Sequence, residues 1–378
     1  MVPSRYAVVD ALPMTTSGKV DRKRLPELAV AEGVSQADFV QPRDPTEQGV
    51  AAAFGAILGT ERVGALDDFF RLGGHSLQAA HLLTRIAEST GVTVAMKDLY
   101  VRPTVEAVAR LIRAGGASAT STLATLRADG TRPALYLVHA VSGSPYSYAP
   151  LARRLEDRPV GGFEAPGFDD YAEPLTAITE MAERYLTDLR AAQPSGPYQL
   201  GGWSFGGFVA VEMAIRLREA GEQIDALVLF DCNPPGPYDP PSEVEIAEAW
   251  VRDLAGLAGA SPEPVASALA DLTGDALVDR LVELVIEAGY LPAEMGPQVL
   301  RRRFRVFRAN VLAMYAYQPR RYDGHMTIVG AQASGGLAEG WGVYAASHGF
   351  TEVPGNHYSM WAADNLPAIA AALETALS

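Results

Sequence analysis

Apolar residues in the first third of the chain recur at helical spacing. Val50, Phe54 and Ile57 fall along one face of a helix, and a similar pattern begins near Ser76. A short helical turn, a proline break and a last helix follow, and the pattern ends in glycines. The spacing therefore predicts a four-helix domain over residues 46–115.

The pattern changes after about residue 132. Short apolar runs, each ending in a glycine or a polar cluster, read "ALYLVHA", "YQLGGWS" and "ALVLFDCNP". Helical segments such as "ITEMAERYLTDLRAAQ" separate them. Strands that alternate with helices are typical of a parallel sheet with crossover helices, so residues 132–378 are predicted to form an α/β domain.

The remaining segments are short and lack the apolar content of a core. Residues 1–28 hold one alternating run and a cluster of Lys and Arg, and residues 29–45 end in proline breakers and read as a linker. Residues 116–131 are rich in small and polar residues and read as a second linker. The chain is therefore predicted to be multidomain.

Composition and charge narrow the possible partners. The formal net charge of −14 argues against a nucleic-acid partner, because such binding depends on Lys and Arg that neutralise phosphates. Cys232 is the only cysteine, which excludes an internal disulfide and a zinc site built on several thiolates, and no metal site is expected. We find neither a signal peptide nor a run of roughly 18 apolar residues, and we expect a cytoplasmic protein without a membrane partner.

A nucleophile motif stands in the α/β segment. The stretch Gly202-Trp203-Ser204-Phe205-Gly206 matches G-x-S-x-G, follows an apolar run and opens a helical one. This is the context of a nucleophile elbow, in which glycines allow the tight turn and the serine hydroxyl stands above the sheet. The alternative is a glycine-rich turn whose serine only caps the helix.

A serine nucleophile needs a base, and the base needs a carboxylate. Asp231 closes the apolar run "ALVLF", at the strand end where catalytic groups gather, whereas Asp225 and Asp323 precede their strands. His357 lies in a loop after the last predicted strand, so the order Ser204, Asp231, His357 is that expected of this fold. The other histidines belong to the helical segment or to predicted strands: His75, His81, His139, His325 and His348.

Acyl transfer by a serine nucleophile also requires N–H donors that stabilise an oxyanion. The first is assigned to Phe205, and the second to Val141 or its neighbour in the loop "HAVSGSPYSY". Residues 234–320 are helical, amphipathic and longer than a simple crossover requires. We interpret this insertion as a lid over Ser204, with a purely structural insertion as the alternative.

Several of these stretches resemble known families. "DDFFRLGGHSLQAAHLL" resembles the attachment motif of peptidyl carrier domains in nonribosomal peptide synthetases, where the serine that corresponds to Ser76 carries 4′-phosphopantetheine. "GGWSFGG", "FDCNPP" and "PGNHYSMW" resemble the type I thioesterase of such assembly lines, an α/β-hydrolase. In that family the acid follows the same strand as Asp231.

The N-terminal stretch "LPMTTSGKVDRKRLPEL" resembles the end of an adenylation domain, with Lys19 at the position of the terminal-motif lysine. Because no nucleotide-binding core accompanies Lys19, we expect residues 1–28 to be a remnant and assign it no activity. The resemblance implies three kinds of partner: upstream adenylation and condensation domains, a phosphopantetheinyl transferase, and an acyl or peptidyl thioester.

Together these features imply the release step of nonribosomal peptide synthesis. Ser76 would carry the thioester, and Ser204 would accept the acyl chain and release it by hydrolysis or cyclisation. An anionic phosphodiester on Ser76 would be favoured at a helix N-terminus. Two alternatives stay open: a carrier fused to a hydrolase-fold domain that only docks other proteins, and a stand-alone esterase or lipase.

Overall fold

The structure is a computed structural model that describes residues 39–377, except 75, 95, 114–120, 169–171, 237–238, 263 and 292–294. The predictions for residues 1–28, Lys19 and His75 lie outside the described residues. The chain divides into two compact units, one comprising Met1–Val92 with Arg102–Gly115 and the other Thr93–Val101 with Gly116–Ser378.

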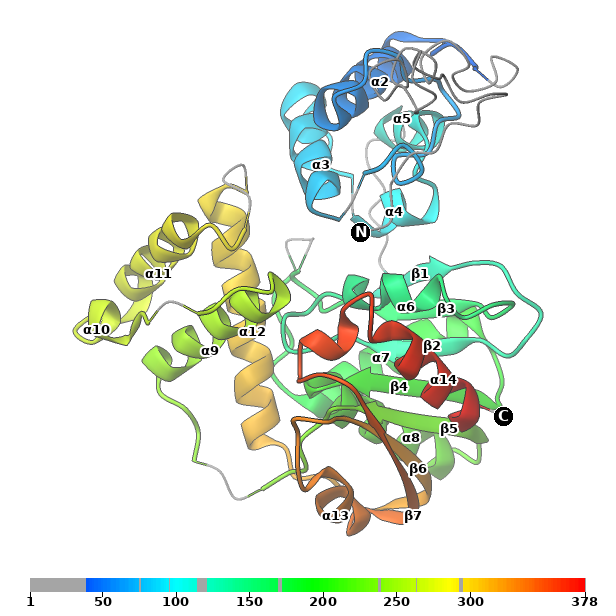
Figure 1. The fold of residues 1–378 in the computed structure, drawn as a ribbon, viewed down its shortest axis with the longest axis vertical. Helices are drawn as coiled ribbons and strands as arrows, with labels where there is room; N and C mark the ends of the chain where they lie inside the picture. The colour runs from blue at the N-terminus through cyan, green and yellow to red at the C-terminus, as the bar shows by residue number, and fades with distance from the viewer. Residues whose placement is uncertain are drawn as a thin grey trace, which may run out of the picture. The chain divides into compact units, whose positions relative to one another are not determined.

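The first unit is helical (Figure 1). Asp44 caps α2 (Pro45–Leu58) by accepting the Glu47 N–H at 2.9 Å, and Gly59 ends that helix in the left-handed conformation. The rings of Phe54 and Phe69 meet edge to face in the core, with centroids 5.1 Å apart. The helices of residues 39–113 are α2 (Pro45–Leu58), α3 (Ser76–Thr90), α4 (Met96–Val101), which groups with the second unit, and α5 (Val105–Arg113).

The second unit is built on a sheet of seven strands in the order β1-β3-β2-β4-β5-β6-β7. All neighbouring strands are parallel except β1, which runs antiparallel to β3. Every residue of β2 and β4 is buried, as expected for parallel strands covered on both faces. The strands are β1 (Leu123–Arg127), β2 (Leu135–Val138), β3 (Val160–Phe163), β4 (Tyr198–Trp203), β5 (Ile224–Phe230), β6 (Tyr322–Ala331) and β7 (Ala345–Val353).

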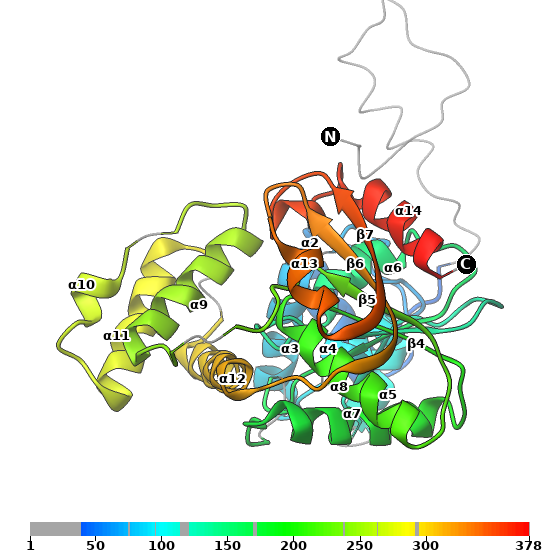
Figure 2. The same cartoon turned by 90° about the horizontal axis from the view of Figure 1, so that it is seen from below.

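Helices cover both faces of this sheet, and each face has its own apolar cluster (Figures 1 and 2). One cluster packs α7 (Ile178–Ala192) and α8 (Phe205–Glu219) against the strands. The other packs α6 (Ala149–Ala152) and α14 (Leu366–Ala376) against the opposite face. The unit is therefore a doubly covered α/β sheet, in agreement with the predicted fold class.

The sequence pattern did not predict two of the strands, β1 and β3. The prediction of a linker over 116–131 is wrong for Leu123–Arg127, which forms β1. Its partner β3 contains two adjacent glycines, which have low strand propensity but are needed here. A Cβ atom on Gly161 would lie 2.9 Å from the Tyr136 ring, and one on Gly162 would lie 2.7 Å from Pro145. Crowding therefore explains the two glycines, and pairing with β1 and β2 holds the segment as a strand that propensity alone does not predict.

A helical insertion lies between β5 and β6 and stands beside the sheet (Figures 1 and 2). Its helices are α9 (Glu243–Leu257), α10 (Ala266–Leu269), α11 (Gly274–Ala288) and α12 (Pro297–Ala316). Inside the insertion, the Trp250 ring of α9 packs on the Phe304 ring of α12, with centroids 5.1 Å apart. In the part of the chain that the structure describes, no helix combines the length and apolar character needed to cross a membrane.

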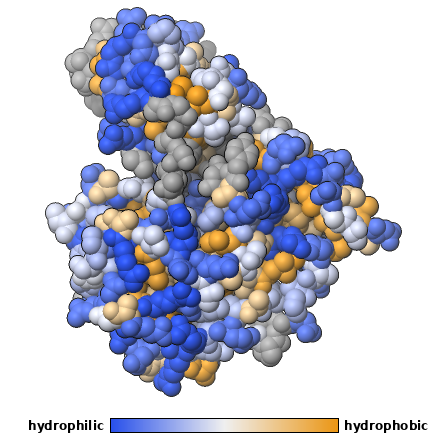
Figure 3. Space-filling model, turned by 180° about the vertical axis from the view of Figure 1, so that it is seen from behind, coloured by the Kyte–Doolittle hydropathy of each residue, from blue (hydrophilic) through white to orange (hydrophobic). Residues whose placement is uncertain are grey.

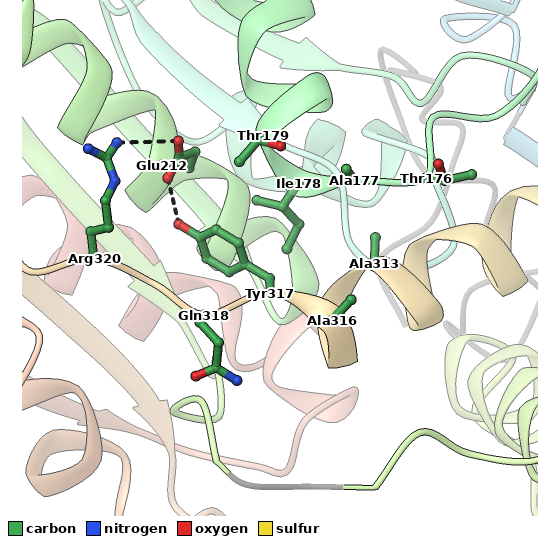
Figure 4. Close-up of a pocket in the computed structure, with 10 residues that line it drawn as sticks. All are labelled: Thr176, Ala177, Ile178, Thr179, Glu212, Ala313, Ala316, Tyr317, Gln318 and Arg320. Carbon is green, nitrogen blue, oxygen red and sulfur yellow. Dashed lines mark hydrogen bonds and ion pairs between the residues drawn. The ribbon is translucent and has the colours of Figure 1, made fainter.

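The C-terminal end of α12 is anchored to α8 by a buried carboxylate. Glu212 accepts a hydrogen bond from the Tyr317 hydroxyl at 2.7 Å, and Arg320 lies 3.5 Å away (Figure 4). It also accepts one from the Arg216 guanidinium at 2.7 Å. Glu212, Tyr317 and Arg320 border a cavity of about 340 Å³ between α7, α8 and α12. The negative charge of this buried carboxylate is thus balanced by arginines, as a buried ionised group requires.

The surface of the molecule is mixed. Hydrophilic residues cover most of the face in Figure 3, with hydrophobic residues scattered among them. Among the described residues, the large apolar side chains that are most exposed are Leu66, Leu257, Val343 and Phe350.

Candidate active site

Ser204 occupies the turn between β4 and α8. Its backbone has φ 54° and ψ −123°, a region that non-glycine residues rarely adopt. A Cβ atom on Gly202 would lie 2.2 Å from the Gly206 carbonyl, and one on Gly206 would lie 2.4 Å from the Val138 carbonyl oxygen. The two motif glycines are therefore required by close backbone approach. The Ser204 side chain makes no capping hydrogen bond to α8, which disfavours the helix-cap alternative.

Asp231 follows the last residue of β5, beside Ser204. Trp203 pairs with Phe230 in the sheet, so the residues after them stand at neighbouring strand ends. The Ser204 N–H donates to the Phe230 carbonyl at 2.9 Å, and the Asp231 N–H donates to the Val329 carbonyl of β6 at 2.8 Å. The register of three strands thus sets the positions of both side chains.

The Asp231 carboxylate has three hydrogen-bond donors. Oδ1 accepts the Ala331 N–H at 2.8 Å, and Oδ2 accepts the Ser334 hydroxyl at 3.0 Å and His357 Nδ1 at 2.7 Å. Burial acts to raise the pKa of Asp231, but the hydrogen bonds from His357 and Ala331 outweigh it, and the pKa lies below its usual value. The carboxyl therefore stays ionised and holds the imidazole in one orientation.

His357 sits in a loop that its neighbours hold in shape. The side chain of Asn356 accepts the N–H groups of Tyr358 and Ser359 at 3.0 and 2.9 Å. The Ala333 N–H donates to the Gly355 carbonyl at 3.1 Å, which joins this loop to the one after β6. The His357 ring lies 5.1 Å from the Trp203 ring, centroid to centroid, and so beside the residue that precedes Ser204.

The structure thus joins two of the three predicted catalytic residues directly. Asp231 and His357 share a hydrogen bond, and Ser204 stands next to both by strand register and by the Trp203 contact. Within the described residues, no hydrogen bond links the Ser204 hydroxyl to His357. Catalytic contacts of this kind are often long before substrate binds.

The two residues predicted to supply the oxyanion donors lie on α8 and in the loop after β2. Phe205 is the first residue of α8, so its N–H has no acceptor within the helix. Val141 follows β2 in a loop that touches the start of α8, since a Cβ on Gly206 would lie 2.5 Å from the His139 carbonyl oxygen. The Asn310 side chain, itself buried on α12, donates to the Val141 carbonyl at 2.9 Å.

Sequence reasoning missed Asn310. It occupies a position on α12 between the buried residues Val306 and Ala313, where the helical spacing predicts an apolar side chain. A polar residue on an apolar helix face is the signal that could have marked it.

His139 is buried and serves a structural role, not that of a general base. Its ring is fully buried, with Nδ1 2.7 Å from the Ala140 carbonyl oxygen and Nε2 2.7 Å from the Tyr185 hydroxyl. Burial lowers its pKa to about 4, so the ring stays neutral near pH 7. His139 thereby stiffens the start of the loop that carries Val141.

Ser76 is the first residue of α3 in the helical unit. Gly73 precedes it with φ +101°, and a Cβ on Gly74 would lie 2.4 Å from the Phe69 ring, so the approach to Ser76 is a tight glycine turn. Ser76 thus stands at the N-terminus of a helix of 15 residues, where helices in general favour an anion. Across the described ranges, no group of three or more His, Cys, Asp or Glu side chains could hold a metal ion.

The chain is similar in sequence to nonribosomal peptide synthetases. The chain is 33% identical over 328 residues to a dimodular nonribosomal peptide synthase of Bacillus subtilis (strain 168), covering 86% of this chain and 13% of that protein. It is 33% identical over 316 residues to malpibaldin synthetase of Mortierella alpina, covering 82% of this chain and 6% of that protein. The chain thus spans a small part of these relatives.

The solved structures that resemble this chain include a nonribosomal peptide synthetase and a thioesterase domain. The four-domain nonribosomal peptide synthetase AB3403, solved in its holo form with AMP and glycine, superposes with a TM-score of 0.65 at 32% identity, covering 99% of this chain and 29% of AB3403. The NocB thioesterase domain, in a covalent complex with a fluorophosphonate nocardicin G analogue, superposes with a TM-score of 0.50 at 25% identity, covering 68% of this chain and 100% of that chain.

Two family models match the chain itself. Residues 48–112 match the phosphopantetheine attachment site, the domain on which 4′-phosphopantetheine is covalently attached. Residues 133–377, most of the chain, match the thioesterase domain. The protein therefore belongs to the thioesterase family and carries a phosphopantetheine carrier domain ahead of its thioesterase domain.

Proposed function

We propose that this protein releases an acyl or peptidyl chain from a carrier-bound thioester through an ester on Ser204, as the last step of a nonribosomal peptide synthetase. The observation that carries the proposal is the 2.7 Å hydrogen bond between His357 and Asp231 beside the Ser204 elbow. The nonribosomal peptide synthetases among the relatives support the assembly-line context.

The side chains divide the chemistry among them. Asp231 accepts the Nδ1 proton of His357, which leaves Nε2 free to take the proton of the Ser204 hydroxyl. Ser204 then attacks the thioester carbonyl, and His357 returns the proton to the departing thiol. A second nucleophile, which is water or an amine or hydroxyl of the product, loses its proton to His357 and releases the chain.

Backbone donors stabilise the charge that develops on the carbonyl oxygen. We assign this role to the N–H groups of Phe205 and Val141, at the start of α8 and in the loop after β2. The insertion over 234–320, with α9 to α12, serves as a lid that shapes the acyl pocket and limits access of water.

Ser76 is the proposed attachment residue in a carrier domain over 46–115. Phosphopantetheine, when bound, supplies a thiol on a flexible arm to which the acyl chain is attached as a thioester. The start of α3 favours the phosphodiester through its free N–H groups. The proposal includes a phosphopantetheinyl transferase as partner, upstream adenylation and condensation domains, and an adenylation remnant at 1–28.

A fluorophosphonate probe tests the thioesterase half. We expect the probe to label the wild-type chain on Ser204, and Ser204→Ala to abolish both labelling and turnover of an acyl thioester. Ser195→Ala, at an exposed serine in the loop before β4, is the matched control and should retain both. Normal turnover by Ser204→Ala would contradict the elbow assignment. An unlabelled wild-type chain would instead favour a docking scaffold.

Enzymatic loading tests the carrier half. A phosphopantetheinyl transferase with coenzyme A should add the mass of the arm to the wild-type chain, and Ser76→Ala should remove the addition. Ser89→Ala, at the other end of α3, is the control that should load normally. Loading of the Ser76→Ala chain would contradict the assignment. Turnover of free esters at the same rate as loaded thioesters would favour a stand-alone esterase.

A further inference from the structure

One carboxylate of the insertion breaks the pattern of its helix. Ile246, Trp250 and Asp253 follow one another at spacings of four and three along the buried face of α9. The first two are apolar, and the third is an aspartate whose exposed fraction is only 5%. Asp is rarely buried to this degree unless it is paired.

This carboxylate faces the loop that carries His357. Asp253 and Gly256 lie three positions apart and share one face of α9. A Cβ atom on Gly256 would lie 2.5 Å from the Tyr358 ring, so glycine at this position lets the helix pack directly on the loop. The Tyr358 side chain is the hydrogen-bonding neighbour of the carboxyl, and the His357 imidazole is close enough to favour its ionised form.

The carboxylate nevertheless lacks a second partner. Its Oδ2 atom is fully buried and has no hydrogen-bond donor within the described residues, and no ion pair there includes it. Glu212 of α8, which anchors the C-terminal end of α12, shows the opposite arrangement, with a tyrosine and two arginines around it. Burial without a cation costs several kcal/mol for an ionised group, and it raises the pKa of Asp253 to about 7.

We propose that Asp253 binds an amino group of the acyl chain and so selects chains that carry one. This inference rests on the proposed function. A protonated amine would supply the missing donor and the missing positive charge together, which a hydroxyl or a methyl group would not. Because α9 lies against the His357 loop, the amino group would be held near the catalytic centre. Asp253 is then a specificity residue of the lid.

The test compares matched acyl thioesters on the full chain. One series ends in an amine and the other in a methyl group, and both cover several chain lengths. For the length that fits, Asp253→Asn should lower kcat/KM for the amino substrate about tenfold or more, as loss of one charge-assisted hydrogen bond predicts. For the methyl substrate the change should stay below about twofold. Glu248→Gln, on the same helix but less buried, should change neither value.

A second variant guards against misfolding. Asp253→Leu restores the apolar stripe of α9 and should invert the preference in favour of the methyl substrate. Equal losses for both series, or no loss at any chain length, would overturn the inference and leave Asp253 with a structural role or none. Fluorophosphonate labelling of Ser204 separates this result from failure of the proposed function, because a labelled and active enzyme without amine selectivity refutes only the role of Asp253.

Discussion

Two buried aspartates approach the same histidine from different parts of the molecule. Asp231 stands at the end of β5, with an exposed fraction of 3%, and Asp253 lies on α9 of the insertion, with an exposed fraction of 5%. Asp231 accepts three hydrogen bonds and its pKa is lowered, whereas Asp253 has one unpartnered oxygen and its pKa is raised to about 7. Similar burial thus leads to opposite protonation behaviour, because the partners differ.

The difference follows from the elements that carry the two residues. The sheet edge presents backbone N–H groups and a second loop to Asp231, and strand register holds them in place. The helix satisfies its own backbone groups, so α9 can offer Asp253 no donors of its own. The carboxylate at the strand end therefore has its hydrogen-bond donors without substrate. The carboxylate on the helix face depends for donors on whatever packs against it.

The largest effect should come from Asp231→Asn. The amide would no longer accept from His357 Nδ1 with a negative charge and would favour the wrong imidazole tautomer, so kcat should fall about 10³-fold or more. Steady-state thioester turnover measures it. Asp323→Asn, at the exposed start of β6, is the control and should be neutral. A loss below about tenfold would show that another carboxyl supports His357.

A smaller effect should appear in the pH dependence of the free energy of unfolding, through Asp253. Because burial raises its folded-state pKa to about 7, the folded chain holds a proton between about pH 4 and 7 that the unfolded chain has released. The free energy of unfolding should therefore fall as pH rises through this window, relative to Asp253→Asn, which does not titrate. From pH 5 to pH 8 the wild type should lose about 3 kcal/mol against the variant.

Denaturant unfolding of both proteins across this pH range measures the difference. His357 and Tyr358 face Asp253, and Arg252 lies near Tyr358, so these groups are retained in both chains. Glu248→Gln should run parallel to the wild type at every pH. A constant gap between wild type and Asp253→Asn would mean that Asp253 is ionised throughout, and that it already has a partner in the folded chain.

Asn310→Leu should follow in size. The substitution keeps the volume of the side chain but leaves the Val141 carbonyl without its donor, and the loop that presents the Val141 N–H loses its link to α12. We expect kcat to fall about tenfold with little change in KM, because an oxyanion donor acts in the transition state. Gln298→Leu, at an exposed position of α12, is the control. Unchanged kcat would separate this loop from catalysis.

The sequence pattern predicted the parts of the molecule that depend on residues close together along the chain. The nucleophile turn needs glycines at fixed positions, and strand ends place Asp231, so both could be read along the chain. The family matches confirm the carrier and thioesterase predictions. Asp231 and His357, chosen by strand and loop position, are hydrogen-bonded in the structure, and their catalytic roles remain proposals.

The missed features depend on contacts between distant segments. β3 is a strand through its pairing with β1 and β2, and Tyr136 and Pro145 leave room only for glycine in it, which propensity does not predict. Asn310 and Asp253 occupy apolar helix faces, and helical spacing predicts that such positions are buried but not which group they will face. Polar residues that interrupt an apolar stripe are the positions where sequence reasoning should look for function.

The smallest effect should come from Ser334→Ala. The hydroxyl donates to Asp231 Oδ2 at 3.0 Å, on the same oxygen that receives His357, while the Ala331 N–H holds Oδ1. Its loss removes one of three donors and should cost about 1 kcal/mol, or about fivefold in kcat/KM. It should also raise the pKa of Asp231 toward its usual value, because the carboxylate is less stabilised. A loss as large as that of Asp231→Asn would mean that the carboxylate is not held by the sheet edge, and the contrast with Asp253 would disappear.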